Sequence, residues 1–303
     1  MRSSAIPVLV MLLALLIVWY LGAILLNAPV QLDTYARGHV AWTPWQLVLD
    51  TWNEGRPVLP SPHQVLTDFW NSTFGVAPTS KRSLVYHAWV TLSATLLGFI
   101  AGTILGIALA VLIVHNDASD RSLMPWIIAS QTIPIVALAP VFVVVTYNLL
   151  TGDNFLSHSF HLTGDTARLV SKALVSTYLS FFPVVVGMVK GFRSPESIQL
   201  DLMHTYNARR TQTFWKLRWP IALPYLFTSM KVAVAASLVG AIVGELPTGA
   251  VAGLGARLLG GSYYGQTVQI WSALLAAALL AGLLVVAVGV VERLVVRRMG
   301  ARP

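Results

Sequence analysis

Long apolar stretches alternate with short polar ones along almost the whole chain. A helix that crosses the roughly 30 Å hydrocarbon core of a bilayer needs about 20 mostly apolar residues. Six segments meet this requirement, and they lie approximately at residues 5–26, 88–114, 124–148, 169–189, 223–244 and 268–291. The pattern therefore predicts an all-α polytopic membrane protein with about six transmembrane helices.

The same pattern divides the chain into four parts. We expect a first transmembrane helix (1–27), an outside segment (28–87), a membrane core (88–292) and a short tail (293–303). A signal peptide is the alternative for the first part, because "MRSS" is a short basic start. Signal peptides have apolar runs of about 7–15 residues, and the run here is longer. We therefore expect the first part to be retained as a helix.

Two short helices are predicted within the polar segment 28–87. Thr43 before Pro44, and Ser61 before Pro62, each place an N-capping residue ahead of a proline at the first helical position. The apolar and tryptophan residues that follow indicate amphipathic helices lying on the outer membrane surface. Both a small lid and an anchor without further function fit this pattern.

Basic residues are distributed unevenly between the two sides of the membrane. If the N-terminus is inside, the inside loops hold twelve Lys and Arg residues and the outside loops five, four of them in segment 28–87. Cytoplasmic loops carry such an excess, so both termini are predicted to be cytoplasmic. Arg168 and Lys172, at the start of the fourth apolar segment, are expected to extend toward the lipid headgroups.

The second apolar segment has a face of small side chains. Ala94, Gly98, Gly102, Gly106 and Ala110 recur every four residues and so lie along one side of a helix. Small residues allow two helix backbones to approach closely in lipid. The face fits ordinary packing within a bundle, and it also fits an interface that moves during gating.

Prolines interrupt the third apolar segment at Pro134 and Pro140. A broken helix at membrane depth is tolerated where its backbone is buried or lines a cavity. A translocation path is therefore expected near this break, with Gln131, Thr132 and Pro134 on it and Glu245 as a further polar group. Each polar side chain could instead satisfy a hydrogen bond between helices.

Composition narrows the choice of function. Charged residues make up 11% of the chain and hydrophobic residues 56%, whereas a soluble domain has about 25% charged residues. The net charge of +8 is explained by basic inside loops and calls for no nucleic acid. Because the chain has no cysteine and its histidines lack a metal-binding spacing, we expect no metal site. No Ser–His–Asp or paired-carboxylate arrangement with suggestive context is present, so we expect no catalytic residues.

No energy source is visible in the sequence. The apolar segments carry no carboxylate near mid-membrane, where an ion-driven carrier usually needs one. No G-x-x-x-x-G-K-[ST] motif is present to bind ATP. Uphill transport would therefore need work from another polypeptide. A secondary transporter or channel that works alone is the alternative, and a membrane-bound enzyme or scaffold is a third possibility without a catalytic constellation to support it.

The stretch "DLMHTYNARRTQTFWKLRWPIALP", residues 201–224, is polar and basic but regularly patterned. Apolar side chains with helical spacing share one side of a short helix at its start: Ile198, Leu202, Met203 and Tyr206. Asn207 suits a break, since Asn tolerates positive φ. A second helical piece is expected to end at Pro220 and Pro224, before the chain re-enters the membrane. A solvated loop without a partner is the alternative.

This stretch resembles the "EAA" loop of the inner-membrane permeases of binding-protein-dependent ABC importers. That loop has Glu-Ala-Ala, a Gly shortly after it and a Pro further along. Here Asp201, Leu202 and Met203 stand at Glu-Ala-Ala, Asn207 at the Gly and Pro220 at the Pro. Asp keeps the charge and Asn keeps the turn tolerance, while Leu-Met is bulkier than Ala-Ala and could indicate a dedicated ATPase.

Other stretches also resemble this family, so that the resemblance covers roughly residues 59–293. They are "LPSP" at 59–62, "FFPVVV" at 181–186, "LPYLFTSMKVAVAASLVGAIVGE" at 223–245 and "GLG" at 253–255. The resemblance is closest to the nitrate, sulfonate, taurine and vitamin-precursor branch. It implies a type I ABC importer permease fold in the bacterial inner membrane, and a small polar solute such as nitrate, a sulfonate, taurine or a pyrimidine-type vitamin precursor.

The resemblance also implies partners. A second permease, in a homodimer, would pair with this chain within the membrane lipid, and a periplasmic binding protein would deliver the solute. A cytoplasmic ATPase dimer would bind ATP and Mg, so that no cofactor is expected on this chain. The ATPase-coupling residues would be Asp201, Leu202, Met203, His204, Asn207, Arg209, Arg210 and Pro220. Arg209 and Arg210 would pair with acidic groups of the ATPase, or would only be part of the inside positive charge.

Overall fold

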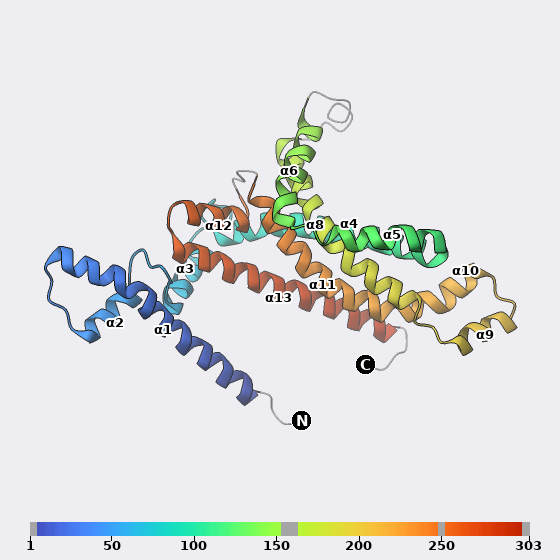
Figure 1. Cartoon of the computed structure of the whole chain (residues 1–303), viewed down its shortest axis with the longest axis horizontal. Helices are drawn as coiled ribbons and strands as arrows, with labels where there is room; N and C mark the ends of the chain where they lie inside the picture. Colours follow the sequence, from blue (N-terminus) through green and yellow to red (C-terminus); the bar gives the residue numbers. More distant parts are fainter. Residues whose placement is uncertain (1–4, 153–162, 248–251, 299–303) are drawn as a thin grey trace. The chain divides into compact units, whose positions relative to one another are not determined.

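The computed structural model describes residues 5–152, 163–247 and 252–298, and within these ranges its regular elements are all helical (Figure 1). The elements, in chain order, are α1 (Ala5–Gly38), α2 (Pro44–Trp52), α3 (Pro62–Phe74), α4 (Leu84–His115), α5 (Asp117–Ser130), α6 (Ile135–Thr151), α8 (Gly164–Phe192), α9 (Ser197–Thr205), α10 (Arg210–Thr213), the π-helical turn η1 (Phe214–Arg218), α11 (Trp219–Glu245), α12 (Leu254–Tyr263) and α13 (Thr267–Arg298). They form two compact units, Met1–Ala88 with Ala256–Ala278, and Trp89–Gly255 with Leu279–Pro303.

Five helical runs of the described chain are long and apolar enough to cross a membrane. They are α1, α4, α8, the continuous run Arg210–Glu245, and α13. The pair α5 and α6 supplies a sixth span if the two are counted together, although they are bent by 100° at the break between them. The prediction of an all-α protein with about six membrane helices is confirmed.

The third predicted span is therefore not one continuous helix. α5 ends at Ser130, and the chain turns through residues 131–134 before α6 begins at Ile135. Pro134 caps α6 with φ −59° and ψ 121°, because a proline can precede a helix but cannot continue one that needs its N–H. Pro140 lies inside α6 and does not end it.

The first helix is longer than the apolar pattern indicated. α1 continues past Pro29 to Gly38, whereas the sequence places its end near residue 26. Its C-terminal end is closed by His39, which has a positive φ of 49°, and by the Val40 N–H bonding to the Tyr35 carbonyl. Residues 1–4 of the predicted first part and 299–303 of the predicted tail lie outside the described residues.

The two short helices after α1 begin where the sequence predicts. The Thr43 hydroxyl accepts a hydrogen bond from the Gln46 N–H at the start of α2, and α3 begins at Pro62 after Ser61. The fully buried Asn27 fastens the chain between them to α1, because its amide makes four hydrogen bonds to the backbone of Thr51, Val58 and Leu59. The position of these helices on the membrane surface remains a prediction.

The core of the second unit is a close contact between α4, α8 and α11. A Cβ on Gly98 would lie 2.2 Å from the Ser176 Cβ, and one on Gly102 would lie 2.1 Å from the Ser180 Oγ. A Cβ on Gly106 would lie 2.7 Å from the Val184 Cβ. The small-residue face of α4 thus lets the α8 side chains reach its backbone.

Serine hydroxyls also join these helices. The Ser176 Oγ of α8 donates to the Ser237 carbonyl of α11 at 2.9 Å, and the Ser237 Oγ donates to the Thr95 carbonyl of α4 at 2.8 Å. In a lipid environment a polar side chain needs a partner of this kind, and such bonds hold neighbouring helices in register. They make α4, α8 and α11 the rigid part of this unit.

Candidate functional site

The polar segment between α8 and α11 folds as a helical hairpin. α9 is only nine residues long, and it starts where the Glu196 N–H donates to the Gln199 Oε1 at 3.1 Å. It ends at Thr205, and the chain then turns at Asn207, whose φ of 50° is left-handed, while the Ala208 N–H closes the turn on the Met203 carbonyl at 3.0 Å. The predicted break at Asn207 is confirmed. A helix this short is marginal alone and is stabilised by packing.

The second helical piece differs from the prediction. It does not end at Pro220 and Pro224 but runs without a break from Arg210 to Glu245, a length of 36 residues. The change from α10 to α11 is made by η1, in which the Trp219 N–H bonds to the carbonyl five residues earlier, at Phe214. Pro220 then falls in the first turn of α11, where a missing N–H is tolerated.

The hairpin presents apolar side chains to solvent. Ile198, Leu202 and Tyr206 follow one another at four-residue intervals and are 70%, 54% and 76% exposed, respectively. Met203 and Pro220 are half-buried. An exposed apolar row on an otherwise polar segment is typical of a surface that binds another protein.

The remaining residues of the predicted coupling loop are charged or polar, and they are exposed: Asp201, His204, Asn207, Arg209 and Arg210. Within the described ranges neither Arg209 nor Arg210 forms an ion pair. The structure thus brings all eight predicted residues into one segment, and it leaves the cationic ones available to a ligand or partner.

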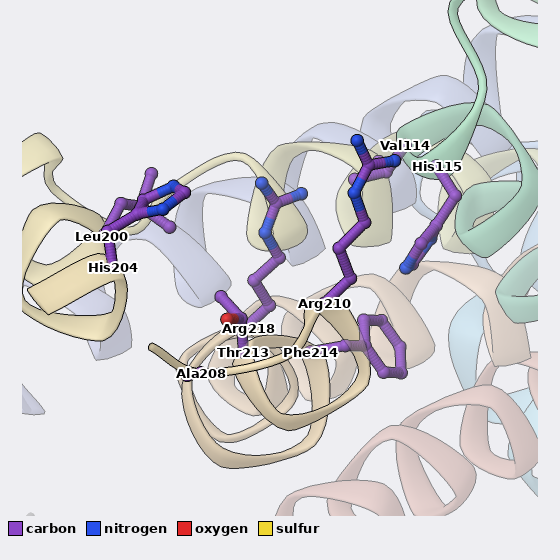
Figure 2. A pocket seen from close by; sticks show the side chains of 9 residues that line it. All are labelled: Val114, His115, Leu200, His204, Ala208, Arg210, Thr213, Phe214 and Arg218. Atoms are coloured by element: carbon purple, nitrogen blue, oxygen red, sulfur yellow. The ribbon is translucent and has the colours of Figure 1, made fainter. Parts of the chain in front are cut away.

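The opposite side of α9 faces inward. Leu200 and His204 line a pocket between α9, the end of α4 and the α10–η1 run, shown in Figure 2. The remaining lining residues come from the other two elements: Val114, His115, Ala208, Arg210, Thr213, Phe214 and Arg218. α9 therefore separates a solvent-facing apolar row from an inner basic pocket.

The predicted translocation residues fall into two groups. Gln131, Thr132 and Pro134 lie at the bend between α5 and α6, where the Thr132 hydroxyl donates to the Ala129 carbonyl at 2.8 Å. Thr132 and Pro134 are exposed and Gln131 is half-buried. The second group is Glu245 alone, at the end of α11, and its contacts are with Thr91, Lys172 and Gly255.

Glu245 is fully buried and lies at the centre of a polar cluster. Its carboxylate accepts hydrogen bonds from the Thr91 hydroxyl at 3.0 and 3.1 Å and from the Gly255 N–H at 2.7 Å. The Lys172 Nζ lies 3.5 Å away, and the Thr91 hydroxyl in turn accepts from the Leu254 N–H at 2.8 Å. The cluster joins α4, α8 and α11 to the start of α12.

The expectation that Lys172 extends toward the headgroups is therefore wrong. Its side chain is only 7% exposed, because the buried carboxylate of Glu245 offers the ammonium group an ionic partner inside the protein. Arg168 differs, since its half-exposed guanidinium pairs with Asp165, 3.5 Å away, at the start of α8.

The "GLG" stretch at 253–255 has a steric role beside this cluster. A Cβ on Gly253 would lie 2.2 Å from the Glu245 carboxylate, and the φ of Gly253 is +129°. A Cβ on Gly255 would lie 2.3 Å from the Ile242 carbonyl. Sequence reasoning missed this cluster, although a lone Lys and a lone Glu in two apolar segments are a signal for pairing.

Comparisons with known proteins identify the relatives of the chain. Residues 102–301 match the family described as binding-protein-dependent transport system inner membrane component. The formylaminopyrimidine transport permease protein ThiX of Halalkalibacterium halodurans is 32% identical over 66% of this chain and 70% of the relative. The riboflavin transport system permease protein RibX of Chloroflexus aurantiacus is 32% identical over 79% of this chain and 80% of its own.

A solved structure shares the fold. An inward-facing structure of the MetNI methionine ABC transporter contains a chain that matches with a TM-score of 0.55. The sequence identity is 19%, and the match covers 70% of this chain and 95% of the other.

Proposed function

The chain belongs to the binding-protein-dependent transport system inner membrane component family, and from that premise we propose how it is coupled to its energy source. It is a permease subunit of an ABC importer and a multi-pass protein of the bacterial inner membrane. We propose that α9 docks in a cleft of a cytoplasmic ATPase subunit. ATP and Mg are bound by that subunit, which performs the hydrolysis, and this chain is not an enzyme.

The observation that carries this proposal is the exposed row on α9. Ile198, Leu202 and Tyr206 would bury their apolar surface in the ATPase cleft, and a fully buried side chain of this size contributes about 1.5–3 kcal/mol. Arg209 lies two residues after the left-handed turn at Asn207, which we call the hinge, and supplies a cation for acidic groups around that cleft. Leu202 and Met203 stand at the two Ala positions of the EAA loop that this stretch resembles. Because they are bulkier than Ala, they make the fit specific to one ATPase.

Docking of α9 on a cytoplasmic ATPase requires the hairpin to lie on the cytoplasmic side of the membrane. The excess of Lys and Arg in this and the neighbouring loops supports that orientation, with both termini inside. Two copies of the chain pair in the membrane, each contacting one ATPase subunit, and a periplasmic binding protein delivers the solute from the other side.

The coupling motion follows from the continuity of the helix after the hinge. When ATP draws the ATPase subunits together, each α9 moves with its cleft. α10, η1 and α11 form one uninterrupted helical run, so the displacement passes along it into the membrane part. α11 packs closely on α8, since a Cβ on Gly240 would lie 2.8 Å from the Ser176 Cα, and the two helices therefore move as one body.

We infer a nitrogen heterocycle, such as a vitamin or its pyrimidine-type precursor, as the transported solute. The support is that ThiX and RibX, each 32% identical over most of its length, carry the names of a formylaminopyrimidine and a riboflavin transporter. Nitrate, sulfonates and taurine are the competing class. A thermal-shift screen of the partner binding protein against both classes decides between them, because that protein selects the solute.

Replacement of Leu202 by Asp tests the coupling proposal. We expect binding of the co-purifying ATPase to weaken by at least about tenfold, because the variant loses apolar burial and places a carboxylate in the interface. Uptake into reconstituted vesicles should fall with it, while membrane insertion stays normal. Ala118→Asp adds the same charge to an exposed position of α5 and serves as the control. Unchanged ATPase binding in Leu202→Asp, or uptake without any ATPase, would refute the proposal and favour a transporter that works alone.

A further inference from the structure

The pocket behind α9 has the size and lining of a binding site. It encloses about 350 Å³, which lies within the roughly 300–1,000 Å³ of small-molecule sites. Figure 2 shows the Arg210 and Arg218 side chains rising from one helical run in the same direction, with His204 on one side and His115 on the other. Thr213 also lines the pocket, and Figure 2 shows its hydroxyl beside Arg218, on the side that faces His204.

Among the described residues, the lining is basic and carries no carboxylate. Two guanidinium groups and two imidazoles contribute to it, together with one hydroxyl and four apolar residues. In the part of the chain that the structure describes, Arg210 and Arg218 form no ion pair, although the other ion pairs of this unit are intact. Two arginines that share a pocket repel one another unless an anion lies between them.

The π-helical turn is what aligns the two arginines. An α-helix rotates by about 100° per residue, so eight residues from Arg210 to Arg218 would overshoot two full turns by roughly 80°. The wider η1 turn rotates less per residue, and it returns Arg218 to the side of the run that Arg210 occupies. Such π turns are frequent at functional sites.

The floor of the pocket is held by aromatic packing. Phe214 is 8% exposed, and its ring lies 5.0 Å from that of His115 and 5.2 Å from that of Phe192, measured between centroids. Trp219 adds a third contact at 6.1 Å. The rings hold the backbone of the α10–η1 run against α4 and α8, so the positions from which the two arginines project are set before a ligand arrives.

We propose that this pocket binds a phosphoryl group. The planar guanidinium groups of Arg210 and Arg218 match the oxygens of a phosphate with paired hydrogen bonds, and the Thr213 hydroxyl and the His204 ring can donate to the remaining oxygens. The His115 ring lines the pocket, and its Nδ1 donates to the Val111 carbonyl at 2.8 Å. The pocket shares His204 and Arg210 with the predicted coupling residues, but the docking proposal rests on the exposed row of α9 and on Arg209, which do not line it.

Its place in the chain favours a phosphoryl group presented by a lipid. The pocket lies where one membrane span, Leu84–His115, ends and another, Arg210–Glu245, begins. Basic pockets at such helix ends bind anionic headgroups, and the 62% exposed Trp215 on η1 is of the type found at membrane interfaces. Free phosphate and nucleotides share the same chemistry and are the second source.

A ligand here would link three elements. It would connect α9, through His204, to the end of α4 and to the α10–η1 run. The hairpin would then be held to the membrane helices on one side of the hinge at Asn207. Occupancy would thus set how freely α9 moves.

The test uses the full-length purified chain in two formats. In the first, nanodiscs of phosphatidylcholine alone are compared with nanodiscs that also contain phosphatidylglycerol, and native mass spectrometry measures the lipid retained by the protein. In the second, the thermal midpoint is measured in detergent with inorganic phosphate or ATP against chloride at equal ionic strength. The double variant Arg210→Gln/Arg218→Gln removes the site. Arg121→Gln/Lys216→Gln removes the same charge from exposed positions outside the lining and is the control.

We expect the double variant to bind the phosphoryl ligand at least about tenfold more weakly, since each charge-assisted hydrogen bond to a guanidinium is lost. The control should stay within about twofold of the wild type. Selective retention of phosphatidylglycerol identifies a lipid source, and stabilisation by phosphate or ATP alone identifies a soluble one. Arg210→Lys/Arg218→Lys, which keeps the charge and loses the paired geometry, should fall between.

Two results overturn the proposal. In one, the wild type shows neither retention of phosphatidylglycerol nor stabilisation by phosphate or ATP. In the other, the control loses as much binding as the double variant, which would mean that general positive charge is responsible. If the wild type binds no phosphoryl ligand and the double variant no longer binds the co-purifying ATPase, the proposal is also overturned, and the pocket receives a carboxylate of that partner instead. The circular dichroism of each variant verifies that it is folded.

Discussion

The buried pair of Lys172 and Glu245 permits a quantitative prediction about the second unit. The two charges lie 3.5 Å apart and are 7% and 0% exposed. At that distance, with an effective dielectric constant of about 20, their attraction is about 5 kcal/mol. Desolvation of the two ions opposes this attraction with a similar magnitude. The pair therefore adds little net stability, but the loss of one member leaves the other as a buried uncompensated charge.

Single and double substitutions separate these terms. We expect Glu245→Gln to lower the free energy of unfolding by about 3–5 kcal/mol, because the ammonium group of Lys172 stays buried without a counter-ion. Lys172→Met should lower it by somewhat less, since the carboxylate keeps its hydrogen bonds from Thr91 and Gly255. The double variant Lys172→Met/Glu245→Gln should lie within about 1–2 kcal/mol of the wild type.

The assay is equilibrium unfolding of the purified chain in mixed micelles, followed by circular dichroism as the SDS fraction rises. The four proteins form a double-mutant cycle, and we expect a coupling energy of at least about 2 kcal/mol. Lys231 and Glu292, 2.5 Å apart and partly exposed, provide the comparison, with a coupling of at most about 1 kcal/mol. A cycle in which both single variants are near neutral, or in which the losses add, would show that the pair is not buried as described.

Three further predictions concern particular positions. Gly102→Leu should destabilise the chain by more than about 3 kcal/mol or prevent folding, because a Cβ there already meets the Ser180 Oγ at 2.1 Å. Gly282→Leu should be neutral in the same unfolding assay, because a Cβ there would have no described atom within 4 Å. Asn207→Gly should leave α9 intact and Asn207→Val should weaken ATPase binding severalfold, since φ is 50°. Asn27→Leu should lower the thermal midpoint markedly by orphaning four backbone groups, whereas Asn71→Leu, the same substitution at an exposed position of α3, should not.

Local features of this fold could be predicted from the sequence. The spans follow from runs of apolar residues, and the starts of α2 and α3 follow from Thr43 and Ser61 before prolines, because these signals act within one helical turn. The break after α9 follows in the same way from the tolerance of Asn207 for positive φ. Each of these outcomes depends on residues that are neighbours in the chain.

Features that depend on distant residues could not be predicted. Lys172 and Glu245 are 73 positions apart, and only the packing of α8 on α11 brings them together. Pro134 signals that a helix must stop, but the 100° bend between α5 and α6 is set by what surrounds them. The η1 turn likewise arises from the contacts of Phe214 with the rings around it, so prolines at 220 and 224 alone suggested an ending that does not occur.

The two ends of the helical run Arg210–Glu245 differ in a way that bears on its function. At Glu245 the carboxylate is enclosed and joined to three other segments, so opening that end requires the exposure of buried charge. At Arg210 the cations are exposed and the hinge at Asn207 is one residue in a left-handed turn. Local opening is easiest where few buried contacts must be broken. In the coupling that we propose, a force applied at α9 would act first on the Arg210 end of this run, while the Glu245 end would stay attached to α4, α8 and the start of α12.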